Sequence, residues 1–394
     1  MRLLFLSFYF RPDLCAGSFR ATALVDALRD RGASNDLEID VITTLPNRYA
    51  TFSEEAAEIE SCDNIKIRRI DLPAHRSDMV GQSRAFMHFA RCVLGIVADR
   101  QYDMIFATSS RLFTATLGAY VSRRKKIPLY LDIRDIFVDT IRDIISPIVA
   151  LPAGVVFSLI ERYTMSRAST INLVSGGFED YFRTRYPDKK LSWFTNGVDA
   201  EFIGLPKHDA KKANTVTRIL YAGNIGEGQC LHDIVPQLAK VLGKRAELVV
   251  IGDGGRRQLL EEAIAAHGAD NVSVQPPVAR PELIQEYQSA DVLFLHLGDY
   301  QAFEKVLPSK LFEYGALGKP VLAGVAGFAA EFVEREISNA AVFPPGNVDL
   351  ARKAFERLRL EDAPRNDFVR KYSRNSISAE MATEIIRAAA SNPV

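Results

Sequence analysis

Short apolar runs alternate with longer amphipathic segments along almost the whole chain. The segments Phe19–Arg31 and Arg84–Ala98 have helical periodicity, and in the first of them the apolar residues fall on one stripe. Strands that alternate with helices are typical of βα repeats, in which a parallel sheet carries helices on both faces. Strands are predicted in the first half at Leu3–Phe10, Glu38–Thr43, Ile65–Leu72, Met104–Ala107, Leu129–Ile133, Thr170–Val174 and Ser192–Thr195.

The polar stretch 204–217 interrupts this pattern, which then restarts. We interpret it as a linker between two domains, with a surface loop inside one domain as the alternative. The predicted organisation is a first domain at 1–203, the linker at 204–217, a second domain at 218–364 and terminal helices at 365–394. Each domain is predicted to be α/β, a Rossmann-like doubly wound parallel sheet, and two such domains facing each other would enclose a cleft.

The second half repeats the alternation with equal regularity. Strands are predicted at Arg218–Gly223, Glu247–Ile251, Val272–Val274, Val292–Leu295, Pro320–Ala323 and Ala341–Phe343. Helices are predicted at Leu231–Leu242, Arg256–Ala266, Pro281–Ser289, Pro308–Leu317, Phe328–Glu336 and Val348–Leu360.

Composition narrows the class of protein. The 394 residues include 49 basic and 49 acidic side chains, so no overall field favours nucleic acid or an anionic membrane. The 4 cysteines form no metal-binding spacing and are expected to be reduced thiols in a cytoplasmic protein. The apolar N-terminus is too short to span a bilayer and is expected to be a buried strand.

Glycine-rich turns follow two predicted strands of the second domain. Gly223, Asn224 and Gly226 come after one strand, and Gly252 and Gly254 come after the next. Glycine lets the backbone approach a ligand closely, and the following helix offers free N–H groups to a phosphate. Plain tight turns are the alternative at both places.

The segment Pro308–Leu322 is the most specific candidate. Ser309 and Lys310 are predicted at a helix N-terminus, where a diphosphate would be stabilised and Lys310 would neutralise charge on a leaving phosphate. Glu313 lies one turn later on the same face, where its carboxylate could accept hydrogen bonds from a ribose. The alternative is a solvated lysine and glutamate on an amphipathic helix.

Further candidates follow other strands. Glu331 comes after a glycine-containing turn and would bind sugar hydroxyls or merely interact with the helix dipole. In the first domain Gly17 and Ser18 are expected between strand and helix, as a loop for an acceptor or phosphate. Asp132, Arg134 and Asp135 are expected at a strand end, for acceptor binding or base catalysis, with a structural Asp–Arg pair as the alternative. No Asp-x-Asp metal clamp is present, so no metal is expected, and His88 and His296 are expected to be structural.

Two features could touch a membrane surface. Arg123–Lys126 is a compact basic run, for which a solvated helix end is the alternative. Ile141–Tyr163 is apolar but broken by proline and glycine, which fits an interfacial segment better than a span.

Taken together, the motifs resemble the large retaining glycosyltransferase family 4, of the GT-B fold, and within it the bacterial enzymes of O-antigen and capsule assembly. The segments that carry the resemblance are Asn196–Asp199, Tyr221–Gly226, Ile251–Gly254, Pro308–Glu313, Gly318–Pro320 and Val342–Gly346.

The resemblance implies a nucleotide-sugar site in the second domain, an acceptor site in the first, and terminal helices that cross back to the first domain. It implies metal-independent transfer with retention, no cofactor besides the nucleotide-sugar, Lys310 at the diphosphate, Glu313 at the ribose and Glu331 near the sugar or phosphate. Many members carry Arg and Lys where this chain has Asn224 and Gln229, and Glu where it has Lys305. Lys305 and Lys310 are the cations expected to replace those that are missing.

The expected function is transfer of a sugar, a hexose or N-acetylhexosamine, from a UDP-sugar to a glycan or polyprenyl-diphosphate-linked acceptor, in synthesis of lipopolysaccharide or O-antigen. The protein is expected in the cytoplasm, with peripheral contact at the inner membrane face and no nucleic acid partner. A nucleotide-sugar 2-epimerase and a non-catalytic nucleotide-sugar-binding subunit are the alternatives.

Overall fold

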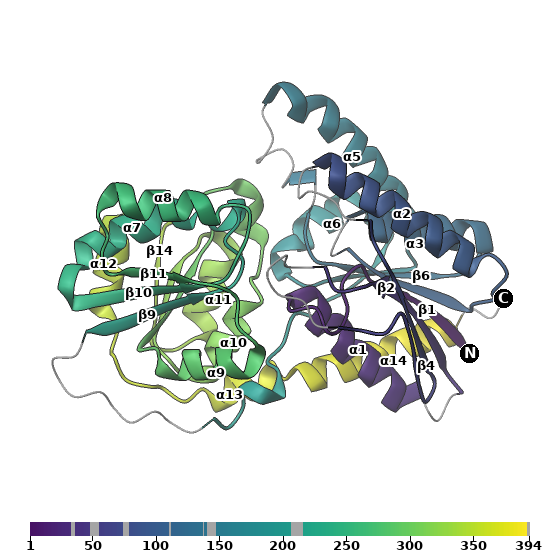
Figure 1. The fold of residues 1–394 in the computed structure, drawn as a ribbon. Coiled ribbons are helices and arrows are strands. Elements are labelled where there is room, and N and C mark those ends of the chain that lie inside the picture. The colour runs from purple at the N-terminus through teal and green to yellow at the C-terminus, as the bar shows by residue number, and fades with distance from the viewer. Residues whose placement is uncertain are drawn as a thin grey trace. The chain divides into compact units, whose positions relative to one another are not determined.

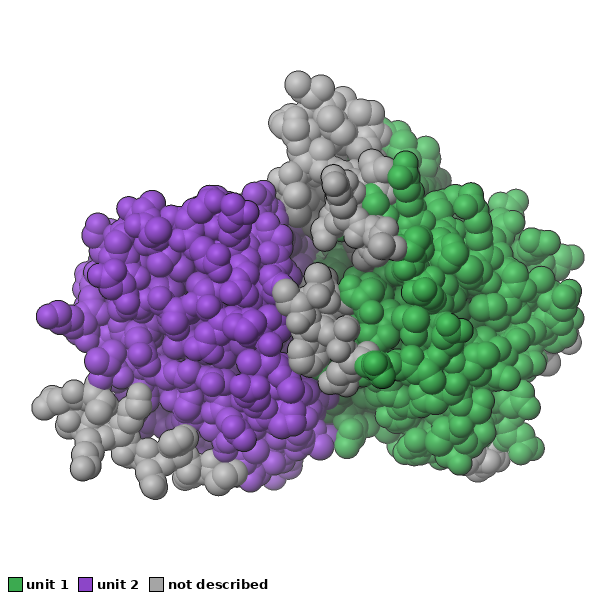
Figure 2. All heavy atoms as spheres, in the orientation of Figure 1, with its two compact units in different colours: residues 1–196, 374–394 green, residues 197–373 purple. Residues whose placement is uncertain are grey.

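The computed structural model describes residues 1–32, 36–47, 55–73, 79–109, 112–136, 138–139, 147–205 and 216–391. Most of the predicted linker, 206–215, lies outside the described residues, as does the first part of the apolar stretch, 141–146. The chain divides into two compact units, Met1–Asn196 with Arg374–Val394 and Gly197–Ser373, which Figure 2 shows in green and purple. The chain thus enters the second unit before the predicted linker and returns to the first for its last helix.

The first unit is built on an eight-stranded sheet in the order β3-β4-β2-β1-β5-β6-β7-β8. All pairs are parallel except β3 with β4. Helices α1 and α14 pack together on one face, while α2, α3 and α5 lie on the other (Figure 1). The elements are β1 (Arg2–Leu6), α1 (Ala16–Gly32), β2 (Glu38–Thr44), β3 (Ile59–Cys62), β4 (Ile65–Ile70), α2 (Met79–Val97), β5 (Met104–Thr108), α3 (Leu112–Lys125), β6 (Leu129–Ile133), α5 (Pro147–Arg167), β7 (Thr170–Leu173), α6 (Glu179–Arg185), β8 (Lys190–Ser192) and α14 (Arg374–Ala390).

The second unit has a six-stranded, wholly parallel sheet in the order β11-β10-β9-β12-β13-β14. One face is covered by α7, α8 and α12, and the other by α9, α10, α11 and α13, with an apolar core on each side. The elements are β9 (Thr217–Ala222), α7 (Leu231–Leu242), β10 (Ala246–Ile251), α8 (Arg257–His267), β11 (Val272–Gln275), α9 (Arg280–Ser289), β12 (Val292–His296), α10 (Lys310–Leu317), β13 (Val321–Gly324), α11 (Gly327–Glu336), β14 (Ala340–Phe343), α12 (Val348–Arg357) and α13 (Asn366–Lys371).

Some predicted boundaries are wrong. Helix α1 begins at Ala16, so Gly17 and Ser18 lie in its first turn and not in a loop before it. The strand predicted at Ser192–Thr195 instead runs over Lys190–Ser192. Beyond it, the carbonyls of Phe194 and Thr195 accept hydrogen bonds from Arg20 and do not pair in the sheet. The short edge strand β3 was not predicted, since most of it is exposed and it lacks an apolar run.

Among the described residues, none of the helices combines the length and the apolar character that crossing a membrane requires. Helix α5, which carries the described part of the apolar stretch, exposes Val155, Val156 and Leu159.

Candidate functional site

The candidate site of the second unit lies at the carboxyl edge of its sheet. The strand order reverses between β9 and β12, and in doubly wound sheets ligands bind outside such a point. The loops that follow β9 and β10 pair through their backbones, with Gly223 N–H donating to Ile251 O at 2.8 Å and Ile225 N–H to Asp253 O at 2.9 Å. The two glycine-rich turns therefore form one continuous layer at this edge.

Close packing between these turns explains the glycines. Gly252 has φ +155°, and a Cβ there would lie 1.8 Å from the carbonyl oxygen of Gly223. At Gly254 a Cβ would lie 2.5 Å from the carbonyl oxygen of Ile225. Gly226 likewise leaves room for the Asn224 amide, which a Cβ would approach to 2.3 Å. The requirement for glycine at 252 and 254 thus comes from the neighbouring loop.

Lys310 reaches the same place from another element. It is the first residue of α10, and Ser309, which precedes it, makes no side-chain cap bond. A Cβ on Gly223 would lie 2.0 Å from Lys310 Nζ, and this ammonium lies 5.7 Å from the centroid of the Tyr221 ring. The structure therefore brings Lys310 and Gly223 together, and sets a positive charge at the end of β9 and the start of α10, where a phosphate would be stabilised.

Glu313 follows one turn later in α10 and is half-buried. One of its oxygens accepts a hydrogen bond from Tyr287 Oη at 3.0 Å, and burial and the Glu313 charge raise the pKa of Tyr287. Arg280 pairs with Asp199 and Glu201, and its positive charge also interacts favourably with the Glu313 carboxylate. The role of Tyr287 was not predicted, because an aromatic residue on a helix gives no signal of a polar contact.

The two positions that depart from the resembled family lie together. Asn224 Nδ2 donates to Gln229 Oε1 at 2.9 Å, and Gly226 N–H donates to the same oxygen at 3.2 Å. Asn224 and Gln229 therefore hold the loop in shape.

The remaining candidates of this unit lie further along the edge. Lys305 is half-buried at the end of the 3₁₀ helix Gln301–Lys305, which packs against the start of α11. Glu331 is exposed in the second turn of α11, after β13.

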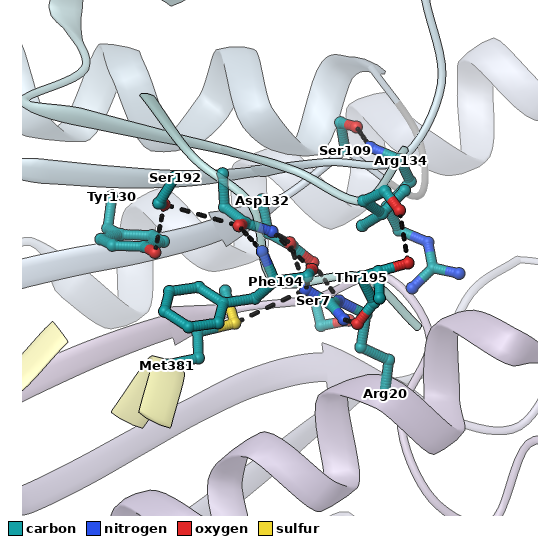
Figure 3. Close-up of polar contacts among 12 residues, drawn as sticks. Ser7, Arg20, Ser109, Tyr130, Asp132, Arg134, Ser192, Phe194, Thr195 and Met381 are labelled. Carbon is teal, nitrogen blue, oxygen red and sulfur yellow. Dashed lines mark hydrogen bonds and ion pairs between the residues drawn. The ribbon is translucent and has the colours of Figure 1, made fainter. Parts of the chain in front are cut away.

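In the first unit Asp132 is the centre of a buried network (Figure 3). Its side chain lies at the end of β6, 1% exposed, and Arg20 donates to both oxygens, from Nε at 2.8 Å and from Nη2 at 2.9 Å. Asn172 Nδ2 adds a third hydrogen bond at 2.8 Å. Burial alone would raise the pKa of Asp132, but the charge and hydrogen bonds of Arg20 outweigh it and lower the pKa. A carboxylate so held is a poor general base, and the network has the form of the structural Asp–Arg pair.

Arg134 and Asp135 follow the same strand. Arg134 N–H donates to Ser109 Oγ at 2.9 Å, while its guanidinium makes no hydrogen bond with any residue that the structure describes (Figure 3). Burial, assisted by the charge of Arg20, lowers the pKa of Arg134, and burial raises the pKa of Asp135 to about 6 against the opposing effect of Arg134. This guanidinium is thus available to an anion.

Gly17 and Ser18 lie in the first turn of α1. The Ser18 side chain is buried, so only backbone N–H groups of this turn, which lack acceptors within the helix, could serve a ligand.

Within the described parts of the chain, no cluster of three or more His, Cys, Asp or Glu side chains could hold a metal ion.

Two family models match the chain, one over most of each compact unit. Residues 17–197 match the family model described as "Glycosyl transferase 4-like domain", and residues 207–376 match "Glycosyl transferases group 1". The chain is 31% identical over 128 residues to the colanic acid biosynthesis glycosyl transferase WcaI of Escherichia coli (strain K12). That alignment covers 31% of this chain and 28% of WcaI, so the chain spans less than a third of the length of this curated relative.

Solved structures share the fold over the full chain. Sucrose-phosphate synthase from Thermosynechococcus elongatus superposes with a TM-score of 0.75 at 13% identity, covering 100% of both chains. HepE from Anabaena, solved in complex with UDP, has a TM-score of 0.59 at 17% identity, covering 98% of this chain and 95% of that chain. Both family matches are thus to glycosyltransferase domains, and the solved structures share the GT-B fold of two parallel-sheet α/β domains.

Proposed function

We propose that this protein transfers a sugar from a UDP-sugar to a glycan or lipid-linked acceptor in the synthesis of a bacterial surface polysaccharide, with retention and without a metal. The observation that carries the proposal is the Lys310 ammonium against Gly223, at the reversal of strand order in the second unit. A cation and a helix N-terminus at this place suit a diphosphate. HepE, of the same fold, was solved with UDP, and WcaI is named for colanic acid biosynthesis.

In this proposal the second unit binds the donor. Lys310 and the start of α10, with Ser309, hold the diphosphate, and the charge of Lys310 stabilises the leaving phosphate. Glu313 accepts from the ribose with the carboxylate oxygen that Tyr287 leaves free, while Lys305 and Glu331 serve the phosphate and sugar region. Gly223, Asn224, Gly226, Gly252 and Gly254 form the floor of the site.

The first unit binds the acceptor in this proposal. The open guanidinium of Arg134 and the first turn of α1 at Gly17 and Ser18 would hold a phosphate of a lipid-linked acceptor, because both favour an anion. Asp135, with its raised pKa, is better suited than Asp132 to exchange a proton with an acceptor hydroxyl at neutral pH. Asp132 keeps Arg20 and the surrounding strand ends in position.

The test is thermal stability against UDP-, GDP-, dTDP- and ADP-sugars, for wild type and Lys310→Ala, with the exposed Lys240→Ala on α7 as control. A ligand at 100 times its Kd stabilises by about 2.7 kcal/mol. Loss of a charged hydrogen-bond partner should weaken binding by about 1.5–3 kcal/mol, roughly 10- to 150-fold in Kd. At that ligand concentration we expect UDP-sugars to stabilise wild type and Lys240→Ala equally, and Lys310→Ala by only about 0.3–1.4 kcal/mol.

Stabilisation by none of the nucleotide-sugars would refute the donor site. Stabilisation of Lys310→Ala equal to that of wild type would remove Lys310 from the site. Binding without transfer to any lipid-linked or glycan acceptor would favour a non-catalytic subunit, and conversion of the donor without an acceptor would favour an epimerase.

A further inference from the structure

His296 lies at the point where the strand order of the second unit reverses. It is the last residue of β12, which pairs with β9 on one side and β13 on the other. Its side chain is 1% exposed. In doubly wound sheets ligands bind outside such a point.

Both ring nitrogens of His296 are engaged by neighbouring loops. Gly346 N–H, in the loop after β14, donates to Nε2 at 3.0 Å, and Nδ1 lies 2.7 Å from the carbonyl oxygen of Gln229, in the loop after β9. Because a backbone N–H can only donate, Nε2 must be unprotonated, so Nδ1 carries the hydrogen and donates to Gln229. The partners thus assign one neutral tautomer.

The ring is also fixed by packing. A Cβ on Gly324 would lie 2.3 Å from His296 Cδ2 and 2.6 Å from Phe343 Cζ, so the ring fills a slot that exists only because residue 324 is glycine. The Phe343 ring lies at a centroid distance of 6.1 Å with an interplanar angle of 29°. The imidazole therefore cannot turn away from its two partners without disturbing this core.

The contact with Gln229 leads to the proposed donor loop. The carbonyl of Gln229 accepts from His296, and the side chain of the same residue accepts from Asn224 Nδ2 and from Gly226 N–H. A second hydrogen bond to this loop comes from the segment after β12, where Gly298 N–H donates to Gly228 O at 2.8 Å. The position of Asn224 thus depends on Gln229, and that of Gln229 on His296.

We propose that His296 is a positioning residue for nucleotide-sugar binding: through Gln229 it holds the turn 223–229 in the conformation that receives the donor. This inference rests on the proposed donor site of the second unit. His296 does not touch the donor, and its contact with Gly346 secures the ring without governing affinity.

Two substitutions separate its two hydrogen bonds. In His296→Asn the side-chain amide can reach the place of Nδ1 and still donate to Gln229, but nothing replaces Nε2. In His296→Gln the amide oxygen can reach the place of Nε2 and accept from Gly346, but the donor to Gln229 is lost. Each variant keeps one bond, so similar decreases in Tm are expected.

The measurement is calorimetric binding of UDP, GDP, dTDP and ADP to the full chain. For the nucleotide that wild type binds, we expect a Kd within about 3-fold of wild type for His296→Asn and at least about 10-fold weaker binding for His296→Gln. Gln229→Leu leaves His296 in place but removes the side-chain oxygen that accepts from Asn224. It should weaken nucleotide binding as much as His296→Gln does. If His296→Gln does not fold, Gln229→Leu takes its place in the test. Equal affinities for the two His296 variants, or weaker binding by the Asn variant, would overturn the proposal.

Hydrogen exchange of the unliganded chain tests whether His296 holds the turn 223–229, independently of any nucleotide. Peptides covering 223–230 should exchange faster in His296→Gln than in wild type and His296→Asn. If wild type binds no nucleotide but this difference is present, the donor site fails and the positioning of the loop by His296 stands. If the exchange rates of the two variants match, the positioning role fails whatever the nucleotide data show.

Discussion

The carboxyl edges of the two sheets are built by different means. In the first unit the edge is organised by buried charge: Asp132 and Arg20 pair at 2.8 Å with almost no exposure, and Arg134 lies nearby. In the second unit it is organised by neutral contacts: turns that pair backbone to backbone, glycines without room for a methyl group, and the uncharged His296. The candidate cation of this unit, Lys310, lies against Gly223 in one of these turns.

This difference shows where each unit is sensitive. A buried ion pair is held together only while both partners are present, because either one alone is a costly buried charge. A layer of close backbone contacts tolerates changes of charge but not of volume. The first unit should therefore respond most to neutralised side chains, and the second to added atoms.

The largest effect is expected for Asp132→Ala, which leaves Arg20 buried and unpaired. We expect a loss of about 3–5 kcal/mol in the free energy of unfolding. The 1 tryptophan of the chain, Trp193, belongs to the first unit, so its fluorescence during urea unfolding reports on that unit. The exposed Asp188→Ala is the control, expected within about 0.5 kcal/mol of wild type.

The double variant Arg20→Met with Asp132→Leu sharpens this test. Since it removes both charges, it should lose less stability than Asp132→Ala alone. A single variant within about 1 kcal/mol of wild type would mean that the pair is not what holds this edge.

For the second unit the matched pair is Gly252→Ala and Gly255→Ala. A methyl group at 252 meets the Gly223 carbonyl in a backbone conformation that alanine disfavours, whereas a Cβ at 255 has no atom within 4 Å. We expect Gly252→Ala to lose about 2–4 kcal/mol and Gly255→Ala to stay near wild type. Calorimetric unfolding measures both, and equal Tm values would show that the layer adapts to added volume.

The same contrast explains what the sequence could predict. The candidate residues of the second unit lie in compact motifs, Gly223 in the turn after β9 and Lys310 and Glu313 in the first turn of α10. They could therefore be chosen from spacing and turn chemistry. The requirement for glycine at 252 and 254 could not be predicted, because it comes from carbonyl groups of another loop that a side chain would meet. The two partners of His296, Gln229 and Gly346, could not be predicted either, because both are far away in sequence.

The network of the first unit could be predicted only in part. Asp132 was a candidate, but its partners Arg20 and Asn172 come from a different helix and a different strand. A signal did exist, since Arg20 lies on the apolar stripe of its helix with Leu24 and Leu28, and Asn172 interrupts an apolar strand. Buried polar residues in apolar patterns require partners, although the pattern does not say which.

Acid should affect the second unit through His296. Burial lowers the pKa of His296 to about 4, and the hydrogen bond to the Gln229 carbonyl and the charge of Asp233 only partly oppose this shift. Because the unfolded chain binds the proton first, stability should fall as pH decreases from about 6.5 to about 4, by roughly 3 kcal/mol, and change no further below that. His296→Gln should flatten this part of the stability–pH profile measured by calorimetry, and an unchanged profile would mean that other groups dominate.

The smallest effect, and the one that relates the first unit to catalysis, is expected for Asp135→Asn. The folded-state pKa of Asp135 is raised to about 6 by burial, so the folded state resists its ionisation and stability falls as pH rises from about 4 to about 6. The variant should be more stable than wild type at pH 8, on the order of 1 kcal/mol after allowance for solvent screening, and no more stable at pH 4, as read by Trp193 fluorescence. If Asp135 serves the acceptor, Asp135→Asn should also lose sugar transfer while its affinity for the donor stays unchanged. The reason is that a buried group with a perturbed pKa, which costs stability, is typical of functional sites. A variant that gains no stability at pH 8 would show that Asp135 carries no such penalty, and full transfer activity would leave its charge without a role at the acceptor.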